Sequence, residues 1–111
     1  MAYDEALAGR IRALLSGEPG VEEKKMFGGL AFLIGGNVAV GASGQGGILV
    51  RVDPAESDDL VTTTPARPME MRGRSMSGWL RVEAEQLATK NELDEWVARG
   101  RDYARSLPPK R

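Results

Sequence analysis

The chain has 111 residues and a mass of 12.0 kDa, enough for one hydrophobic core, so we expect a single domain over residues 1–111. It contains no cysteine and no histidine, which excludes disulfides, zinc–thiolate sites and catalysis by either side chain. With a net charge of -1 and a pI near 5.5, it has no bulk positive potential for nucleic acid.

The N-terminal segment predicts an amphipathic helix. Between Ala2 and Ser16 the apolar residues recur at spacings of three and four, which places them along one side of a helix, and Gly17 with Pro19-Gly20 ends it. These apolar residues are Tyr3, Leu7, Ile11, Leu14 and Leu15. The segment carries early acidic residues and lacks the apolar run of a signal peptide or membrane anchor, and we therefore expect a cytoplasmic protein.

Glycine-punctuated apolar runs over residues 26–53 predict an antiparallel β-meander, because the glycines suit turns and the Val, Ile, Leu and Phe residues suit a half-buried sheet. The predicted strands are Gly29–Ile34, Val38–Ala42 and Ile48–Val52. The charged segment Val21–Lys25 is either the approach to this sheet or a short edge strand whose lysines discourage pairing. The pattern makes Phe32, Val40 and Val50 candidates for one shared face but does not fix the register.

Two capping patterns predict the remaining helices. Asp53-Pro54-Ala55-Glu56 is typical of a helix start, and this short helix is expected to end near Thr62. Thr89-Lys90-Asn91-Glu92 predicts a capping box at the start of the last helix, after a helical turn that runs through Leu87. The apolar side of this last helix is Leu93, Trp96, Val97, Gly100, Ala104 and Leu107.

Residues 66–82, between these helices, predict a second hairpin with its turn at Gly73 and Trp79–Val82 as the returning strand. In that strand Leu80 and Val82 share one face, and Trp79 and Arg81 share the other. The chain as a whole therefore predicts an α+β fold, with an antiparallel sheet of about five strands and flanking helices in the order α-βββ-α-ββ-α.

The second hairpin holds the residues that could form an interaction site. A basic strand pair with an aromatic side chain could bind nucleic-acid phosphates and stack a base, although a solvated arginine face with a core tryptophan is the favoured interpretation. These residues are Arg67, Arg72, Arg74, Arg81 and Trp79. The methionines Met69, Met71 and Met76 are either core filler or an adaptable surface for a partner or a second copy.

Other clusters predict no chemistry. The glycine-rich segment Gly41–Gly47 lies between two predicted strands, whereas phosphate-binding glycine loops precede a helix. The acidic residues Asp53, Glu56, Asp58 and Asp59 are accounted for by the start of a helix, and their spacing does not indicate a metal site. We therefore predict no catalytic residues, no cofactor and no metal.

The run MFGGLAFLIGGNVAVG, followed by LVRVDP, ARPMEMRGR, SGWLRV and WVARGRDYARSLP, resembles the TfoX N-terminal domain family, also called TfoX/Sxy. The most specific features are Met26-Phe27-Gly28-Gly29, Pro68-Met69 and Gly78-Trp79, in that order and spacing. The resemblance implies an α+β domain like that of bacterial competence regulators, in which a helical domain follows, and it implies a stand-alone form here. It supplies no catalytic residues to carry over.

Two hypotheses follow for function. The first is a non-enzymatic domain of bacterial transcription regulation that binds a protein partner or forms a homodimer, through the outer sheet face and the hairpin Met69–Met76. The second is a nucleic-acid-binding module that uses the basic hairpin from Arg67 to Arg81. Neither hypothesis involves a membrane.

Overall fold

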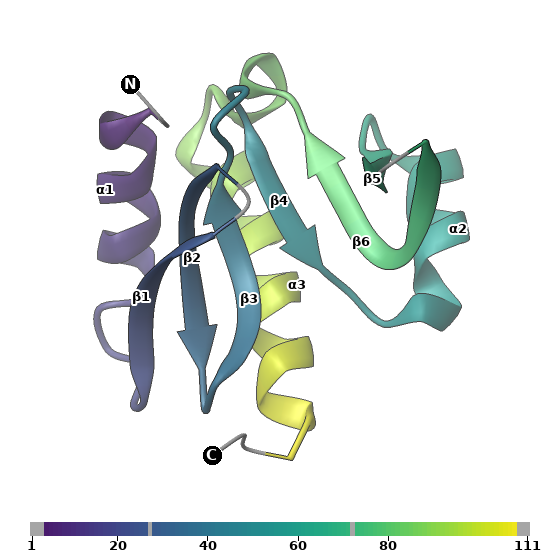
Figure 1. The fold of residues 1–111 in the computed structure, drawn as a ribbon. Coiled ribbons are helices and arrows are strands. Elements are labelled where there is room, and N and C mark those ends of the chain that lie inside the picture. Colours follow the sequence, from purple (N-terminus) through teal and green to yellow (C-terminus); the bar gives the residue numbers. More distant parts are fainter. Residues whose placement is uncertain (1–3, 27, 72, 109–111) are drawn as a thin grey trace.

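The computed structural model describes residues 4–26, 28–71 and 73–108, which form a six-stranded sheet with three α-helices and one 3₁₀ helix (Figure 1). In chain order the elements are α1 (Glu5–Leu14), β1 (Val21–Met26), β2 (Gly29–Ile34), β3 (Asn37–Ala42), β4 (Ile48–Arg51), α2 (Pro54–Thr63), β5 (Arg67–Met71), β6 (Arg74–Val82), η1 (Ala84–Leu87) and α3 (Lys90–Ser106). The strand order is β1-β2-β3-β4-β6-β5, and these neighbours pair antiparallel. The α+β prediction is confirmed, and the additional strand is the charged segment Val21–Met26.

Side-chain caps begin α2 and α3 as the sequence predicts, and α1 also has one. At α2 the Asp53 carboxylate accepts a hydrogen bond from the Ala55 N–H at 2.9 Å, and Asp4 caps α1 in a similar way. At α3 the predicted capping box is complete, because the Glu92 N–H donates to Thr89 Oγ1 at 3.1 Å and the Thr89 N–H donates to Glu92 Oε1 at 3.0 Å.

Among the helices that the structure describes, none has the length and the apolar composition needed to span a membrane.

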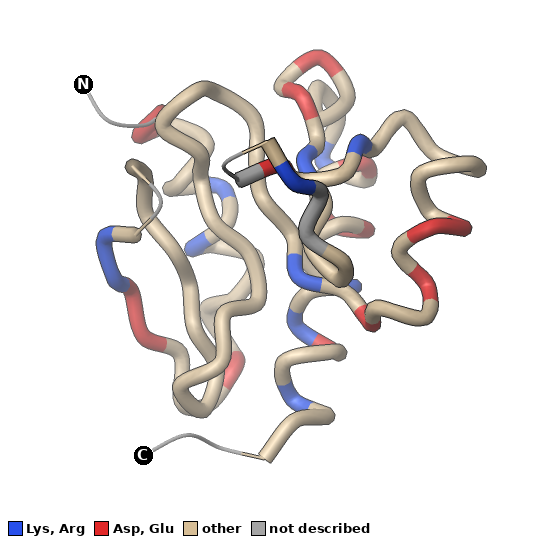
Figure 2. The backbone as a smooth tube through the Cα atoms, turned by 45° about the vertical axis from the view of Figure 1, so that its right-hand side comes forward, with Lys and Arg blue, Asp and Glu red and all other residues tan. Residues whose placement is uncertain are grey.

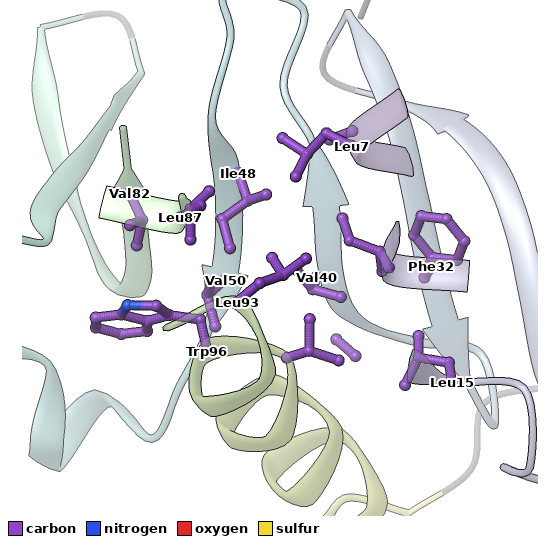
Figure 3. Packing of buried hydrophobic residues seen from close by; sticks show 14 of the residues in the cluster. Leu7, Leu15, Phe32, Val40, Ile48, Val50, Val82, Leu87, Leu93 and Trp96 are labelled. Atoms are coloured by element: carbon purple, nitrogen blue, oxygen red, sulfur yellow. The ribbon is translucent and has the colours of Figure 1, made fainter. Parts of the chain in front are cut away.

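One face of the sheet carries the main core, which we call the core face. Phe32 pairs with Val40 and Val40 with Val50, and all three side chains are fully buried, which confirms that they share a face. Residues from α1 and α3 pack onto this face, as Figure 3 shows for Leu7 and Leu93. The buried residues of α3 are Leu93, Trp96, Val97, Gly100 and Ala104, which confirms these positions of the predicted apolar side. Leu107, which also belongs to the predicted apolar side, is the half-buried C-cap after the helix.

The second hairpin is longer than predicted, because β6 begins at Arg74 and not near Trp79. Gly78 has a φ of +85°, a left-handed conformation that glycine tolerates, and Figure 1 shows β6 bending sharply between its two halves. The Gly78 carbonyl accepts a hydrogen bond from the Val52 N–H at 2.8 Å. The residues of β6 after the bend therefore pair with both β4 and β5, and the residues before the bend pair with β5.

Candidate interaction surface

The sheet face opposite the core face carries a smaller apolar cluster, and we call this surface the second face. Ala31, Leu33 and Val38 form the buried cluster, and Met26 and Trp79 pack against it. Ala31 and Leu33 alternate along β2 with residues of the core face, as side chains of a strand do. The strands β1, β2, β3 and β6 thus contribute to one small, buried apolar cluster that is separate from the main core.

A groove of about 550 Å³ lies beside this cluster. Its lining residues are Glu22, Glu23, Lys24, Met26, Leu33, Gly36 and Val38. The charged residues come from β1 and the apolar ones largely from β2 and β3. An apolar centre with a charged margin is the usual composition of a surface that binds another polypeptide.

Arg51 fixes Trp79 at the margin of the second face. The guanidinium carbon of Arg51 lies 5.4 Å from the centroid of the Trp79 ring and 5.7 Å from that of Tyr103. Both distances fall within the range of cation–π attraction. Arg51 also pairs with Trp79 in the ladder between β4 and β6, so the side chain connects these two strands to α3.

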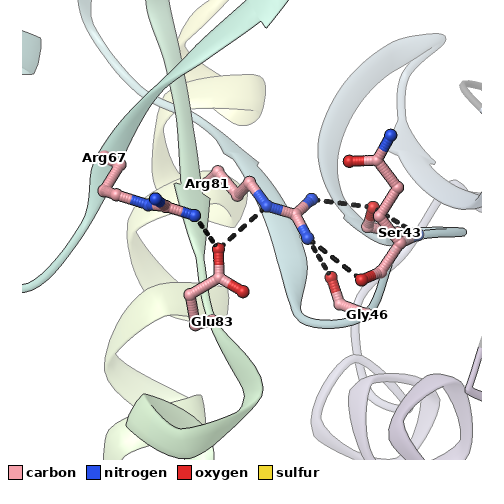
Figure 4. A network of polar contacts seen from close by, with 6 residues as sticks. Ser43, Gly46, Arg67, Arg81 and Glu83 are labelled. Carbon is pink, nitrogen blue, oxygen red and sulfur yellow. Dashed lines mark hydrogen bonds and ion pairs between the residues drawn. The ribbon is translucent and has the colours of Figure 1, made fainter.

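Arg81 is held by a network of hydrogen bonds inside the protein (Figure 4). Its Nη1 donates to Ser43 Oγ at 2.9 Å, and its Nη2 donates to the carbonyl oxygens of Gln45 at 3.2 Å and Gly46 at 2.8 Å. Its Nε donates to Glu83 Oε2 at 3.0 Å, and only 15% of the side chain is exposed. Arg81 therefore ties the β3–β4 loop to β6, and its guanidinium is already occupied by protein acceptors.

The model of a protein family described as the TfoX N-terminal domain matches residues 13–104 of the chain. The chain belongs to this family. The match includes all six strands and α2, so the second face and the Arg81 network both lie within the family domain. No curated protein and no solved structure matches the chain.

The residues that carry the family resemblance have structural roles in this TfoX N-terminal domain. A Cβ on Gly29 would lie 1.9 Å from the Ala42 carbonyl oxygen, so β2 and β3 can approach closely only because Gly29 has no side chain. Met69 is buried, Gly78 forms the bend of β6, and Trp79 packs on the second face. Phe27 lies outside the described residues.

Met69, one of the three methionines predicted as an interaction surface, has an exposed fraction of only 7%. Of the two interpretations that the sequence leaves open for it, core filler therefore fits this residue. The side chains of Met71 and Met76 lie outside the described part of the structure. The role of Met71 and Met76 in a partner-binding surface therefore stays a prediction.

Two of the predicted arginines meet at one acidic residue. Arg67 donates to Glu83 Oε2, the same oxygen that accepts from Arg81. Arg74 is exposed, and Arg72 lies outside the described residues. Sequence reasoning missed the acceptors in the β3–β4 loop and the stacking of Arg51, because neither contact has a local signal in the chain.

These arginines hold the pKa of the Glu83 carboxyl below its ordinary value of 4.5, chiefly through the hydrogen bond from Arg67, with further contributions from Arg81. A lowered pKa in the folded state stabilises the fold above the unfolded-state pKa, and this contribution is lost as the pH falls through the folded-state pKa.

We therefore expect Glu83→Gln to reduce the loss of stability as the pH falls below the ordinary carboxyl pKa of 4.5. The effect should be less than about 1 kcal/mol, because Arg67, the main cause of the lowered pKa, has 63% of its side chain exposed. Urea unfolding of both proteins across this fall in pH measures the effect. Identical pH dependence in the variant and the wild type would contradict it.

Proposed function

We propose that this TfoX N-terminal domain is a non-enzymatic regulatory domain of the bacterial cytoplasm that acts by binding another protein through its second face. The observation that carries the proposal is the groove on the face opposite the core face, which Met26, Leu33 and Val38 line together with charged residues of β1. Family membership supports a role in transcription regulation of the kind that competence regulators perform.

The composition of the second face favours a polypeptide ligand. Its groove is lined by apolar residues and by Glu22, Glu23 and Lys24, so a bound polypeptide would meet apolar contacts and orienting charges. Trp79 adds a half-buried aromatic side chain, a residue type that is enriched among those that dominate binding energy. The absence of histidine and cysteine from the sequence supports a binding role over catalysis.

Nucleic-acid binding by the arginine hairpin receives less support. Arg81 is occupied by acceptors of the protein, and Glu83 places negative charge beside both Arg67 and Arg81. A protein binds nucleic-acid phosphates through cationic side chains that displace the counterions condensed on the nucleic acid. An arginine that is already paired with a carboxylate displaces them poorly. The positive charge of the hairpin is therefore partly neutralised within the domain.

Affinity capture with tagged wild-type protein and a Trp79→Ala variant tests the proposal. We expect the wild type to retain a specific protein from extracts of its native cell, and Trp79→Ala to weaken this binding by at least about tenfold. The dissociation constant of the recovered protein, measured by titration calorimetry, quantifies the loss. Circular dichroism establishes that the variant remains folded.

Tyr103→Ala is the matched control. Tyr103 stacks on the same Arg51 as Trp79 does, but it belongs to α3 and not to the sheet. Truncation of Tyr103 therefore removes a comparable cation–π contact and leaves the second face intact, so binding should persist. The proposal would be refuted if Trp79→Ala and Tyr103→Ala lost binding equally. It would also be refuted if no protein bound the wild type more tightly than Trp79→Ala.

A further inference from the structure

β1 lies at the edge of the sheet, and within the described part of the chain β2 is its one strand neighbour. Its central residues Glu22, Glu23, Lys24 and Lys25 are exposed, and Figure 2 shows its acidic and basic segments along the outer rim of the molecule. An edge strand offers backbone N–H and C=O groups to another strand. Lysines on an edge usually oppose such pairing, but here two acidic residues precede two basic ones.

This charge order is complementary to itself in an antiparallel register. When two identical strands pair about a twofold axis, one residue faces its own counterpart, and the residues on either side of it face each other. With Glu23 on the axis, Glu22 of each copy faces Lys24 of the other copy. Glu22 and Lys24 both lie on the second face, because they pair with Leu33 and Ala31 in β2. Two ion pairs would therefore form across the junction on that face.

The two Glu23 residues would face each other on the opposite side of the sheet, but each already has its own counter-charge. Arg12 of α1 donates from Nε to Glu23 Oε2 at 2.6 Å and from Nη2 to Oε1 at 2.7 Å. In the same register Lys25 of the other copy is the diagonal neighbour of Glu23. The like charges at the axis are thus compensated from both copies.

The neighbouring register is less favourable. With Lys24 on the axis, Glu23 of each copy would face Lys25 of the other copy, so this register also forms two ion pairs. However, the two Lys24 side chains would then face each other on the second face, and Glu22 would face Met26 in place of a basic residue. Because Arg12 supplies a counter-charge for Glu23 within each copy, the like charges at the axis are offset with Glu23 there, and this favours the register with Glu23 on the axis.

We propose that two copies of this chain pair antiparallel along β1, with Glu23 at the twofold axis, and so join their sheets into one. This self-association goes beyond the proposed binding of a different protein and does not depend on it, and the two share the charged residues Glu22, Glu23 and Lys24 of β1. One strand from each copy makes a small interface, so the dimer dissociates on dilution.

Charge exchange tests the pairing. Sedimentation velocity of the wild-type protein at rising concentration should show a monomer–dimer equilibrium, and Glu22→Lys or Lys24→Glu should each weaken it at least about tenfold. An equal mixture of the two variants should form heterodimers. Glu22→Lys carries lysine at positions 22 and 24, Lys24→Glu carries glutamate at both, and the two strands therefore have opposite charges. Glu70→Lys, an exposed charge reversal on the other edge strand β5, should leave the dimer unchanged.

A wild-type protein that stays monomeric at high concentration would overturn the proposal. A dimer that is insensitive to both charge reversals, or variants that do not associate when mixed, would overturn it equally. Because all these substitutions are at exposed positions, circular dichroism should show the same folded structure for each variant.

A cysteine substitution tests the register, since the natural chain has no cysteine. Directly opposed residues of antiparallel strands have Cα atoms about 4.5–5.5 Å apart, within the range of a disulfide. Glu23→Cys should therefore form a disulfide-linked dimer on mild oxidation. Lys25→Cys should not, because its counterpart would lie about 14 Å away along the strand. Equal or faster cross-linking of Lys25→Cys would refute the register.

Discussion

Gly100→Ala should lower the free energy of unfolding by about 2–3 kcal/mol, although alanine is normally the better helix residue. A Cβ on Gly100 would lie 2.2 Å from the Ala39 carbonyl oxygen, 2.9 Å from its carbonyl carbon and 3.3 Å from Val50 Cγ1. Two of these three atoms belong to the backbone of β3, so no side-chain rotation can relieve the contact. The helix α3 would have to move away from the sheet and loosen the core between them.

Gly9→Ala is the control for this prediction. Gly9 is also inside a helix, α1, but a Cβ built there would meet no atom within 4 Å. Alanine at this position should therefore raise the free energy of unfolding by up to about 1 kcal/mol. Urea unfolding of both variants measures the two effects, and a Gly100→Ala protein as stable as Gly9→Ala would contradict the close packing of α3 on β3.

Local sequence patterns predict the helix starts of this fold well, because a cap is a contact between residues close together in the chain. The capping box of Thr89 and Glu92 is an example, since both partners lie within one turn of α3. β1 is the opposite case. Four consecutive charged residues leave no apolar alternation, and its assignment as a strand depends on pairing with β2, which the pattern cannot decide.

The candidate surface could be predicted only in part, for the same reason. Alternation along β6 correctly places Trp79 and Arg81 on one face, opposite Leu80 and Val82. Alternation does not show what each side chain meets. Arg81 donates a hydrogen bond to Ser43, which is 38 positions away in the chain. Arg81 is therefore a structural residue, although the sequence places it in a basic hairpin.

Arg81→Met should lower the free energy of unfolding by about 2–3 kcal/mol, because it removes four hydrogen bonds from a charged donor group and keeps a side chain of similar length. The carbonyl oxygens of Gln45 and Gly46 would lose their guanidinium donor. Arg81→Lys should recover only part of the loss, since an ammonium group cannot bond to acceptors on two sides as the planar guanidinium does. Hydrogen exchange should show faster opening of the Gly46 amide, which donates to the Ser43 carbonyl at 3.1 Å.

Arg67→Ala provides the comparison, because Arg67 binds the same Glu83 carboxylate but has 63% of its side chain exposed. An exposed ion pair contributes little to stability, so this variant should lose less than about 1 kcal/mol and leave the exchange of the loop amides unchanged. Equal losses for Arg67→Ala and Arg81→Met would show that Glu83 alone accounts for the contribution of Arg81. A larger loss for Arg81→Met, together with faster exchange in the β3–β4 loop, would establish that Arg81 holds this loop against β6.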